Sequence, residues 1–373
     1  MATRVGIVGG GQLARMMAEA ASALGIEVSV LARPADESVA HLADIVDGSP
    51  LVVADMEALA ARVDVITFDH EPADLAAVEA VEASGAVVRP SSQALRWADK
   101  AVARRSMSDA GLPVPPFVVT RSPGDVVLFA AEVGWPVVAK LARGGFDGRG
   151  VHVLASSDEA VDLCAAVDVD LVVEPQLDIS TELAVLVVTG ADGSQVTYDP
   201  VRSVQERGMC REVILGDLDP ALAARARRVA EDVADAVGAV GVLAVELFVV
   251  GGEVLVNEVA PRPHNSGHLS IDACVTSQFE NHLRAAAGLP LGSPMAMQSA
   301  AAMVNVVGVD DQHDPRARLA DGLAVPDARV HFYAKSPRAE RKVGHVTVVG
   351  VDPEAALSRA RAAVAALEAV GDV

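Results

Sequence analysis

Cysteine and basic residues are both scarce in this 373-residue sequence. The three cysteines, Cys164, Cys210 and Cys274, are far apart and odd in number, which argues against a disulfide framework or a cysteine zinc cluster and favours a reduced compartment. Lysine and arginine total 30 against 51 acidic residues, for a formal net charge of -21. Nucleic acids and anionic membranes attract basic surfaces, so we expect neither as a partner, although a local basic pocket for phosphates is compatible with this balance.

The N-terminus also lacks the charged-then-apolar pattern that is typical of a signal peptide. One long uncharged stretch, residues 285–309, contains Gly288, Pro290, Gly292 and Pro294. These residues would break a membrane helix, so we predict a loop followed by a buried strand. The expected protein is soluble and cytoplasmic, and its length suits two or three domains.

The first motif is "VGIVGGGQLARMM", residues 5–17, where an apolar strand pattern meets a glycine turn and then a helix pattern that Gly25 closes. Gly9, Gly11 and Ala14 fit G-x-G-x-x-A, a form of the dinucleotide-binding fingerprint. The next predicted strand, 27–32, has no acid at its end for a ribose. Only one motif therefore favours a nicotinamide oxidoreductase. We interpret the glycine turn instead as a structural turn or as a site for another anion.

Strand and helix patterns alternate over residues 1 to about 90, with further strands predicted at 64–68 and 86–90. This alternation indicates an α/β domain with a parallel sheet, which we expect to span residues 1–98. We expect a second domain over 99–295 and a third over 296–373. Within the second, β-rich segments fill 113–185, among them "WPVVAKL", "GVHVL", "LVVEPQL" and "ELAVLVV". Asp219-Pro220 and Asp352-Pro353 are typical of helix starts, and Gly238 of a helix end.

Residues 242–259 form a predicted β-hairpin that carries two acids, Glu246 and Glu258, in otherwise apolar strands. Buried carboxylates need a paired charge or a metal, and Mg²⁺ prefers oxygen ligands. A two-residue turn, Gly251-Gly252, would place Glu246 opposite Asn257, whereas a three-residue loop would place it opposite Glu258. A metal site therefore predicts an odd-length loop or a bulge; the alternative is two acids that are salt-bridged or exposed.

The segment "KLARGGFDGRG" follows a predicted strand that ends at Lys140. Its glycines free backbone amides to approach phosphate oxygens, and Arg143 and Arg149 add positive charge. The segment is no Walker A loop, because G-K-[ST] is absent. A flexible hairpin without a ligand is the alternative interpretation.

The segment "NEVAPRPHNSGH", residues 257–268, gathers polar side chains around two prolines, which stiffen the backbone and pre-organise a site. Arg262 is suited to bind a carboxylate or phosphate with both arms of its guanidinium. His264 and His268 have the spacing of metal ligands on a helix, but Pro263 and Gly267 argue against a regular helix there.

These motifs resemble those of the ATP-grasp superfamily and, within it, of the 5-(carboxyamino)imidazole ribonucleotide synthetases of purine biosynthesis. The resemblance covers nearly the whole chain and includes "GGGQLARM", "GGFDGRG", "TSQFENHLRA" and "HFYAKSPRAERKVGH". It implies a mixed α/β and α+β architecture: an N-terminal Rossmann-like domain, a central ATP-grasp domain and a small C-terminal domain. It also implies an ATP- and Mg²⁺-dependent ligase that converts bicarbonate to carboxyphosphate and carboxylates the amine of aminoimidazole ribonucleotide.

The resemblance further implies the site residues. Lys100 and Lys140 would bind the ATP phosphates beneath the glycine loop, and the hinge at residues 174–177 would contact adenine. Glu182 would bind the ribose, and the pair Glu246 and Glu258 would bind Mg²⁺. The complete ATP-binding set is Lys100, Lys140, Gly144, Gly145, Phe146, Asp147, Gly148, Arg149, Gly150, Glu174, Pro175, Gln176, Leu177, Glu182, Gln205, Asn257 and Glu258.

A second set would bind bicarbonate and the ribonucleotide. The catalytic residues implied are Asp147, Arg262, His264, Asn265 and Lys335, and the substrate-binding residues are Gly10, Gly11, Gln12, Glu71, Arg149, Lys335, Arg341 and Lys342. Phe146 replaces the usual tyrosine and Gln205 an expected histidine, which affects substrate affinity more than reaction type. The family also implies small-molecule substrates and a homodimer.

Two related classes share part of this pattern. A formate-dependent glycinamide ribonucleotide transformylase would keep the glutamate pair and P-R-P-H, but N-S-G-H and R-K-V-G-H favour the carboxylating enzyme. A non-catalytic nucleotide sensor would not need the intact set of acids and cations.

Overall fold

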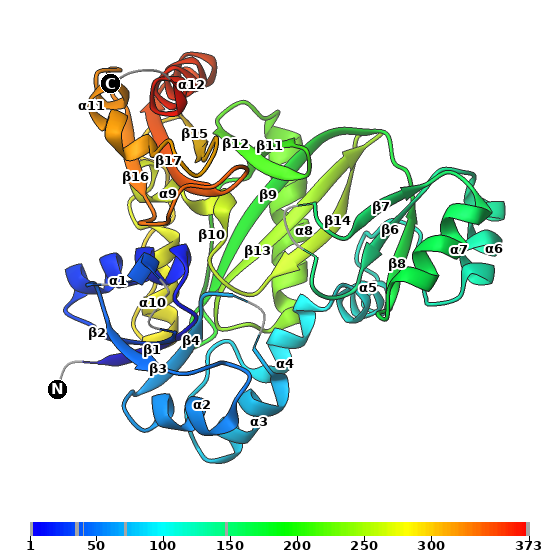
Figure 1. The fold of residues 1–373 in the computed structure, drawn as a ribbon, viewed down its shortest axis with the longest axis horizontal. Helices are drawn as coiled ribbons and strands as arrows, with labels where there is room; N and C mark the ends of the chain where they lie inside the picture. Colours follow the sequence, from blue (N-terminus) through cyan, green and yellow to red (C-terminus); the bar gives the residue numbers. More distant parts are fainter. Residues whose placement is uncertain (1–2, 34–36, 40, 71–72, 146–147, 371–373) are drawn as a thin grey trace.

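The computed structural model describes residues 3–33, 37–39, 41–70, 73–145 and 148–370. Three sheets organise the chain: a parallel sheet near the N-terminus, a small antiparallel sheet, and a large central sheet to which the C-terminal strands belong. Figure 1 shows the small sheet and its helices on one side of the central sheet and the N-terminal unit on another. Among the helices of the described part, none is long and apolar enough to span a bilayer.

The N-terminal sheet has the order β3-β2-β1-β4, and its pairs are all parallel. Its helices pack on both faces, so the strands are apolar on both sides. Leu13 and Met17 of α1 pack on one face together with Phe279 and Leu283 of α10. The elements are β1 (Arg4–Val8), α1 (Gln12–Leu24), β2 (Glu27–Ala32), η1 (Glu37–Val39), β3 (Asp44–Asp47), α2 (Val53–Ala60), β4 (Val65–Phe68) and α3 (Leu75–Ala83).

The predicted strands at 27–32 and 64–68 are confirmed as β2 and β4. The strand predicted at 86–90 was wrong: only Val88 forms a bridge, to Ile66. The β3 strand was not predicted, because Asp44 and Asp47 interrupt its apolar pattern. A short connection leads to the next unit through α4 (Ser92–Leu95), η2 (Arg96–Ala98) and α5 (Lys100–Asp109).

The small sheet has the order β5-β8-β6-β7 and is antiparallel. Val137 and Ala139 of β6 are buried against its two helices, so by strand alternation Lys140 faces the opposite side. The elements are β5 (Val118–Thr120), α6 (Pro123–Val133), β6 (Val137–Leu141), β7 (Val151–Leu154), α7 (Ser157–Ala166) and β8 (Leu171–Pro175). The predicted segment "ELAVLVV" lies in β9, which belongs to the central sheet.

The central sheet has nine strands in the order β14-β13-β9-β11-β12-β15-β17-β16, with β10 paired to β9. Alternate residues of β9 face opposite layers: Val185 packs with α8, and Leu186 with α10. The strands are β9 (Ile179–Thr189), β10 (Gln195–Thr197), β11 (Val201–Glu206), β12 (Met209–Leu215), β13 (Gly241–Val250), β14 (Glu253–Ala260), β15 (Ala300–Val307), β16 (Arg329–Phe332) and β17 (Lys342–Gly350).

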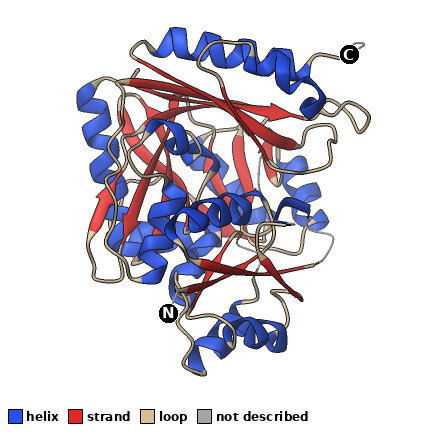
Figure 2. Ribbon diagram, turned by 90° about the vertical axis from the view of Figure 1, so that its left-hand side faces the viewer, coloured by secondary structure: helices blue, strands red, loops and turns tan. Residues whose placement is uncertain are grey.

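Helices cover this sheet, as Figure 2 shows from the side. The predicted helix starts are confirmed: the Asp219 carboxylate caps α8, the Asp352 carboxylate caps α12, and Gly238 ends α8 in the left-handed conformation. The buried strand predicted after residue 285 is β15. The remaining helices are η3 (Asn265–Gly267), α9 (Ser270–Ala273), α10 (Gln278–Ala287), η4 (Pro315–Arg318) and α11 (Leu319–Leu323), beside α8 (Pro220–Val237) and α12 (Pro353–Glu368).

Candidate functional site

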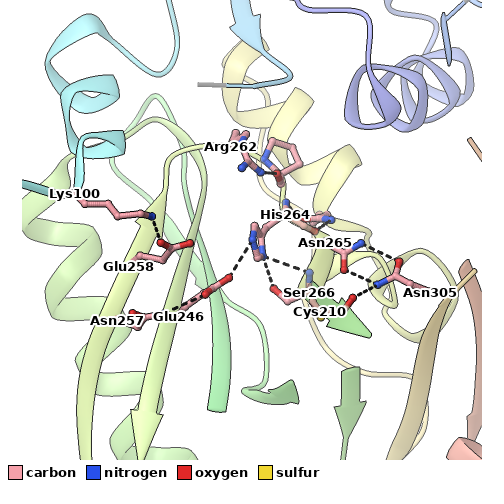
Figure 3. A network of polar contacts seen from close by, with 12 residues as sticks. Lys100, Cys210, Glu246, Asn257, Glu258, Arg262, His264, Asn265, Ser266 and Asn305 are labelled. Carbon is pink, nitrogen blue, oxygen red and sulfur yellow. Dashed lines mark hydrogen bonds and ion pairs between the residues drawn. The ribbon is translucent and has the colours of Figure 1, made fainter. Parts of the chain in front are cut away.

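The hairpin of β13 and β14 places Glu246 directly opposite Glu258. Its turn is the two-residue one, Gly251-Gly252, with φ of 58° and 87°, values that glycine adopts at low cost. The register then shifts beside Glu246, so that Asn257 is the extra residue of a β-bulge. The predicted bulge is therefore confirmed and the three-residue loop is not. The bulge brings the side chains of Glu246, Asn257 and Glu258 together (Figure 3).

The two carboxylates of this pair have opposite pKa shifts. Burial, then repulsion from Glu258, raises the pKa of Glu246 to about 8. Burial also opposes ionisation of Glu258, but the charge and hydrogen bond of Lys100, together with the charge of Lys140, outweigh burial and lower the pKa of Glu258. A cation between the two side chains would relieve their repulsion, which makes the pair suited to a divalent metal.

Two lysines converge on this pair from different elements. Lys100, at the start of α5, forms an ion pair with Glu258. Lys140, at the end of β6, donates from Nζ to Asn257 Oδ1 at 2.8 Å and lies 2.8 Å from Glu174 Oε2. Both predicted phosphate ligands therefore lie beside the carboxylates and place two positive charges there; their contact with ATP stays a prediction.

Glu174 is 2% exposed and belongs to β8. Its carboxylate lies between Lys140 and Arg104, and Arg104 also donates to the carbonyls of Val256 and Asn257 at 2.7 and 2.9 Å. The Glu174 side chain therefore ties the small sheet to β14 and orients Lys140. Nothing in the sequence indicates that Arg104 is buried beside Glu174, because a single arginine on a predicted helix is ordinarily exposed to solvent.

Glu182 of β9 receives a hydrogen bond from Gln205 of β11, and burial raises the pKa of its carboxyl group. Of the hinge residues, Pro175 ends β8, and Gln176 and Leu177 follow it. The backbone amide of Gln176 donates to the Pro136 carbonyl at 3.3 Å. The predicted contacts of these residues with adenine and ribose stay predictions.

The glycine loop connects β6 to β7 and reaches the central sheet. A Cβ atom at Gly148 would lie 2.7 Å from the Cα of Gly208, in the turn between β11 and β12. Gly144, Gly145, Arg149 and Gly150 flank this contact, whereas Phe146 and Asp147 lie outside the described residues. The loop thus approaches the sheet that carries the carboxylates.

The segment after β14 extends the site. His264 Nε2 lies 3.2 Å from Glu246 Oε1, and His264 Nδ1 accepts a hydrogen bond from the Ser266 amide at 3.3 Å, so the imidazole proton belongs on Nε2. The Asn265 amide exchanges two hydrogen bonds with Asn305 of β15, at 2.8 and 3.1 Å (Figure 3). Arg262 donates to the Pro263 carbonyl at 2.9 Å. Asn305 was not predicted, because its β-strand is otherwise apolar.

The N-terminal glycine turn holds a carboxylate of the chain itself. Asp69, which follows β4, accepts hydrogen bonds from the amides of Gly11 and Ala14. A Cβ atom at Gly11 would lie 2.5 Å from Asp69 Oδ2, so any side chain at this position would displace the Asp69 carboxylate. The amides that hold a pyrophosphate in a dinucleotide fold are thus occupied, which argues against the nicotinamide alternative.

Gln12, the first residue of α1, projects toward the C-terminal part of the chain. Its Oε1 accepts from Lys335 Nζ at 2.6 Å, and its Nε2 lies 3.1 Å from His268 Nε2. Lys342 begins β17, and its positive charge offsets part of the rise in the pKa of Glu246. Arg341 donates to the Ser336 carbonyl at 2.9 Å. Gly10 lies in the same turn, and Glu71 lies outside the described residues.

The residues present fit a magnesium ion that is shared with a substrate. In the described ranges, no group of three or more His, Cys, Asp and Glu side chains is placed to hold a metal. Glu246 and Glu258 offer carboxylate oxygens, and Mg²⁺ commonly takes one or two carboxylates and completes its shell with substrate phosphates and water. His264 and His268 do not form a histidine metal site: the first contacts Glu246, and the second is buried beneath Gln12.

Two lysines from different elements, a glycine loop on a small sheet and a carboxylate pair on a central sheet define the ATP-grasp class. Family models agree: residues 1–99 match the ribonucleotide synthetase preATP-grasp domain, 105–279 the ATP-grasp domain, and 301–359 the phosphoribosylaminoimidazole carboxylase C-terminal domain. Figure 1 shows these segments in that order.

Curated relatives narrow the class. The N5-carboxyaminoimidazole ribonucleotide synthase of Mycobacterium tuberculosis (strain ATCC 25618 / H37Rv) is 43% identical over 97% of this chain and 87% of its own. That of Corynebacterium ammoniagenes is 37% identical over 96% and 90%. The chain belongs to the N5-carboxyaminoimidazole ribonucleotide synthase family of ATP-grasp ligases.

Solved structures agree. The N5-carboxyaminoimidazole synthase of Aspergillus clavatus, in complex with ADP and 5-aminoimidazole ribonucleotide, superposes with a TM-score of 0.89 at 30% identity and covers 98% of each chain. The N5-carboxyaminoimidazole ribonucleotide synthetase of Thermus thermophilus has a TM-score of 0.88 at 32% identity, over 97% of this chain and 98% of that one.

Proposed function

We propose that this chain uses ATP and bicarbonate to carboxylate the exocyclic amine of 5-aminoimidazole ribonucleotide, and that it releases ADP and phosphate. The observation that carries the proposal is the contact between Glu246 and His264, 3.2 Å from Oε1 to Nε2. This contact joins two parts of the site. One part, with the carboxylate pair and the two lysines, is suited to ATP phosphates, and the other, the segment Arg262–Asn265, is suited to a small anion. Membership of the family supports the same reaction.

On the ATP side, Lys100 and Lys140 would exchange Glu258 and Asn257 for phosphate oxygens. Glu246 and Glu258 would hold Mg²⁺, which offsets the negative charge of the phosphates during phosphoryl transfer. The glycine loop would cover the phosphates and exclude water, which matters because carboxyphosphate hydrolyses readily. Glu182 would bind the ribose hydroxyls.

On the substrate side, bicarbonate oxygen would attack the γ-phosphorus of ATP, with ADP leaving. Arg262, His264 and Lys335 would hold the resulting carboxyphosphate by its oxygens. The substrate amine would then attack its carbonyl carbon, the carbon–oxygen bond to phosphate would break, and the amine would lose a proton. Asp147, outside the described residues, is proposed as the acceptor of that proton. Arg149, Arg341 and Lys342 would bind the phosphate of the ribonucleotide.

The test measures ADP release by purified protein with Mg²⁺-ATP, bicarbonate and aminoimidazole ribonucleotide, each omitted in turn. In a second arm, bicarbonate labelled with ¹⁸O should transfer one labelled oxygen to the released phosphate, which reports the carboxyphosphate route. Turnover with glycinamide ribonucleotide and formate in place of these substrates would reassign the chain to the transformylase. Absence of turnover with either ribonucleotide and its one-carbon substrate would refute both reactions.

We also propose that the chain forms a homodimer, as the resemblance to its family implies. Light scattering on the eluting protein should then give twice the chain mass of 38.4 kDa. A mass of one chain across the accessible concentration range would overturn this proposal.

A further inference from the structure

A row of four side chains runs from the protein interior to the substrate side of the site. It consists of Gln278 (α10), His268 (after η3), Gln12 (α1) and Lys335 (after β16), and we call it the hydrogen-bonded row. Its three contacts measure 3.2 Å from Gln278 Nε2 to His268 Nδ1, 3.1 Å from His268 Nε2 to Gln12 Nε2, and 2.6 Å from Gln12 Oε1 to Lys335 Nζ.

The backbone fixes the interior end of the row. The amide N–H of His264 donates to Gln278 Oε1 at 2.9 Å, and Gln278 Nε2 donates to the His264 carbonyl at 2.7 Å. Reversing the Gln278 amide would break both bonds, so its NH₂ group faces His268. Nδ1 of His268 must therefore accept a hydrogen bond.

His268 has one proton to place. Its side chain is 0% exposed, and its ring lies 5.2 Å from the ring of His345 and 5.5 Å from that of Phe279. Burial, together with the nearby His264 and Lys342, holds the pKa of His268 well below its usual range, so the ring is neutral. Because Nδ1 accepts, the proton lies on Nε2 and points at Gln12.

The row therefore contains one donor too many. His268 Nε2–H calls for an acceptor on Gln12, and the Lys335 ammonium, which has only donors, calls for an acceptor on the same side chain. Gln12 has a single oxygen, and an amide presents oxygen to one side and NH₂ to the other. One contact of the row must join two donors as long as Lys335 is protonated, whichever way the amide is turned.

We propose that His268 is a positioning residue that turns Gln12 toward the substrate. When an acceptor atom of the substrate draws the Lys335 ammonium away, Gln12 Oε1 is released to accept from His268 Nε2–H. The NH₂ group of Gln12 then points to the substrate side, so that Gln12 and Lys335 together donate to acceptor atoms of the ligand. This inference rests on the proposed function only for the identity of that ligand, the ribonucleotide.

The first test needs no substrate. Histidine labelled with ¹⁵N reports the protonated ring nitrogen, and His268 should carry its proton on Nε2; a proton on Nδ1 would overturn the proposal. Gln12→Glu supplies acceptors to both donors and should raise the thermal midpoint above those of the wild type and of Gln12→Met, a variant of similar length. A Gln12→Glu midpoint below that of Gln12→Met would show that no donor excess exists.

The second test uses turnover. His268→Phe keeps the ring and removes both nitrogens, and should raise KM for the ribonucleotide by roughly tenfold, the effect of one lost hydrogen bond. KM for ATP should not change, and His268→Gln, whose amide reaches toward Gln12, should recover part of the loss. An equal rise in both KM values, or none, would refute the positioning role. A wild type without ribonucleotide-dependent turnover would instead refute the proposed function and leave the first test in force.

Discussion

Glu246 lies directly opposite Glu258 although only two residues, Gly251 and Gly252, join their strands. Regular pairing from that turn would place Asn257 opposite Glu246. The bulge at Asn257 corrects the register by one residue and aims both carboxylates to one side, with Asn257 between them bonded to Lys140. The backbone irregularity thus creates the proposed metal site, since a regular hairpin would separate the two acids onto opposite faces.

Substituting Glu258→Gln should abolish Mg²⁺-ATP turnover while the chain stays folded. The variant loses one of two carboxylates proposed for the metal and the charge that holds Lys100. Loss of a charged group that acts in phosphoryl transfer is expected to reduce kcat by roughly 10²-fold or more. Initial rates of ADP release measure the effect. The matched control is Glu253→Gln, which changes an exposed residue of the same hairpin. Equal rates of ADP release in the two variants would contradict the assignment of Glu258 as a metal ligand.

Glu246→Gln should stabilise the protein in the absence of metal and still inactivate it. Burial and Glu258 both disfavour a charged Glu246, so a neutral amide of the same shape removes that cost. The gain expected is about 1 kcal/mol in the free energy of unfolding. Thermal midpoints with and without Mg²⁺ and ADP test this point. The wild type should gain more from these ligands than the variant does, and a variant less stable than the wild type without metal would contradict the prediction.

The sequence predicts local elements better than the contacts that join them. The hairpin, the capped helices and the buried strand at 300–307 depend on neighbouring residues, and the structure confirms them. The exact register of the hairpin depends on a bulge that the sequence left open. Other contacts of the site join residues from distant elements: Asp69 with Gly11, Arg104 with Glu174, and His268 with Gln12. Such partners follow from the packing of whole units, which no local pattern encodes.

Asp69→Asn should loosen the glycine turn at the start of α1. The buried carboxylate accepts from the amides of Gly11 and Ala14, and the amide that replaces it offers one acceptor oxygen instead of two. We expect a loss of about 1.5–3 kcal/mol in the free energy of unfolding and a higher KM for the ribonucleotide, with KM for ATP unchanged. Chemical denaturation and initial rates measure both. Asp74→Asn alters another helix cap, at the exposed start of α3, and should affect neither KM.

The contribution of His282 to the stability of the protein should rise with pH between about 3 and 6.5. His282 is buried, which lowers its pKa from 6.5 to about 3. It accepts from the Val242 amide at Nδ1 (3.0 Å) and donates from Nε2 to Thr67, so a proton added at Nδ1 would break the first bond. In this pH window the unfolded chain binds a proton that the folded chain does not, so acid favours unfolding by roughly 1.4 kcal/mol per pH unit for this group.

Chemical denaturation at pH 5.0 to 6.5 measures the slope of the free energy of unfolding against pH. His282→Gln should have a smaller slope than the wild type and than His152→Gln, a control that removes an exposed histidine. An unchanged slope in His282→Gln would mean that another group provides the pH dependence.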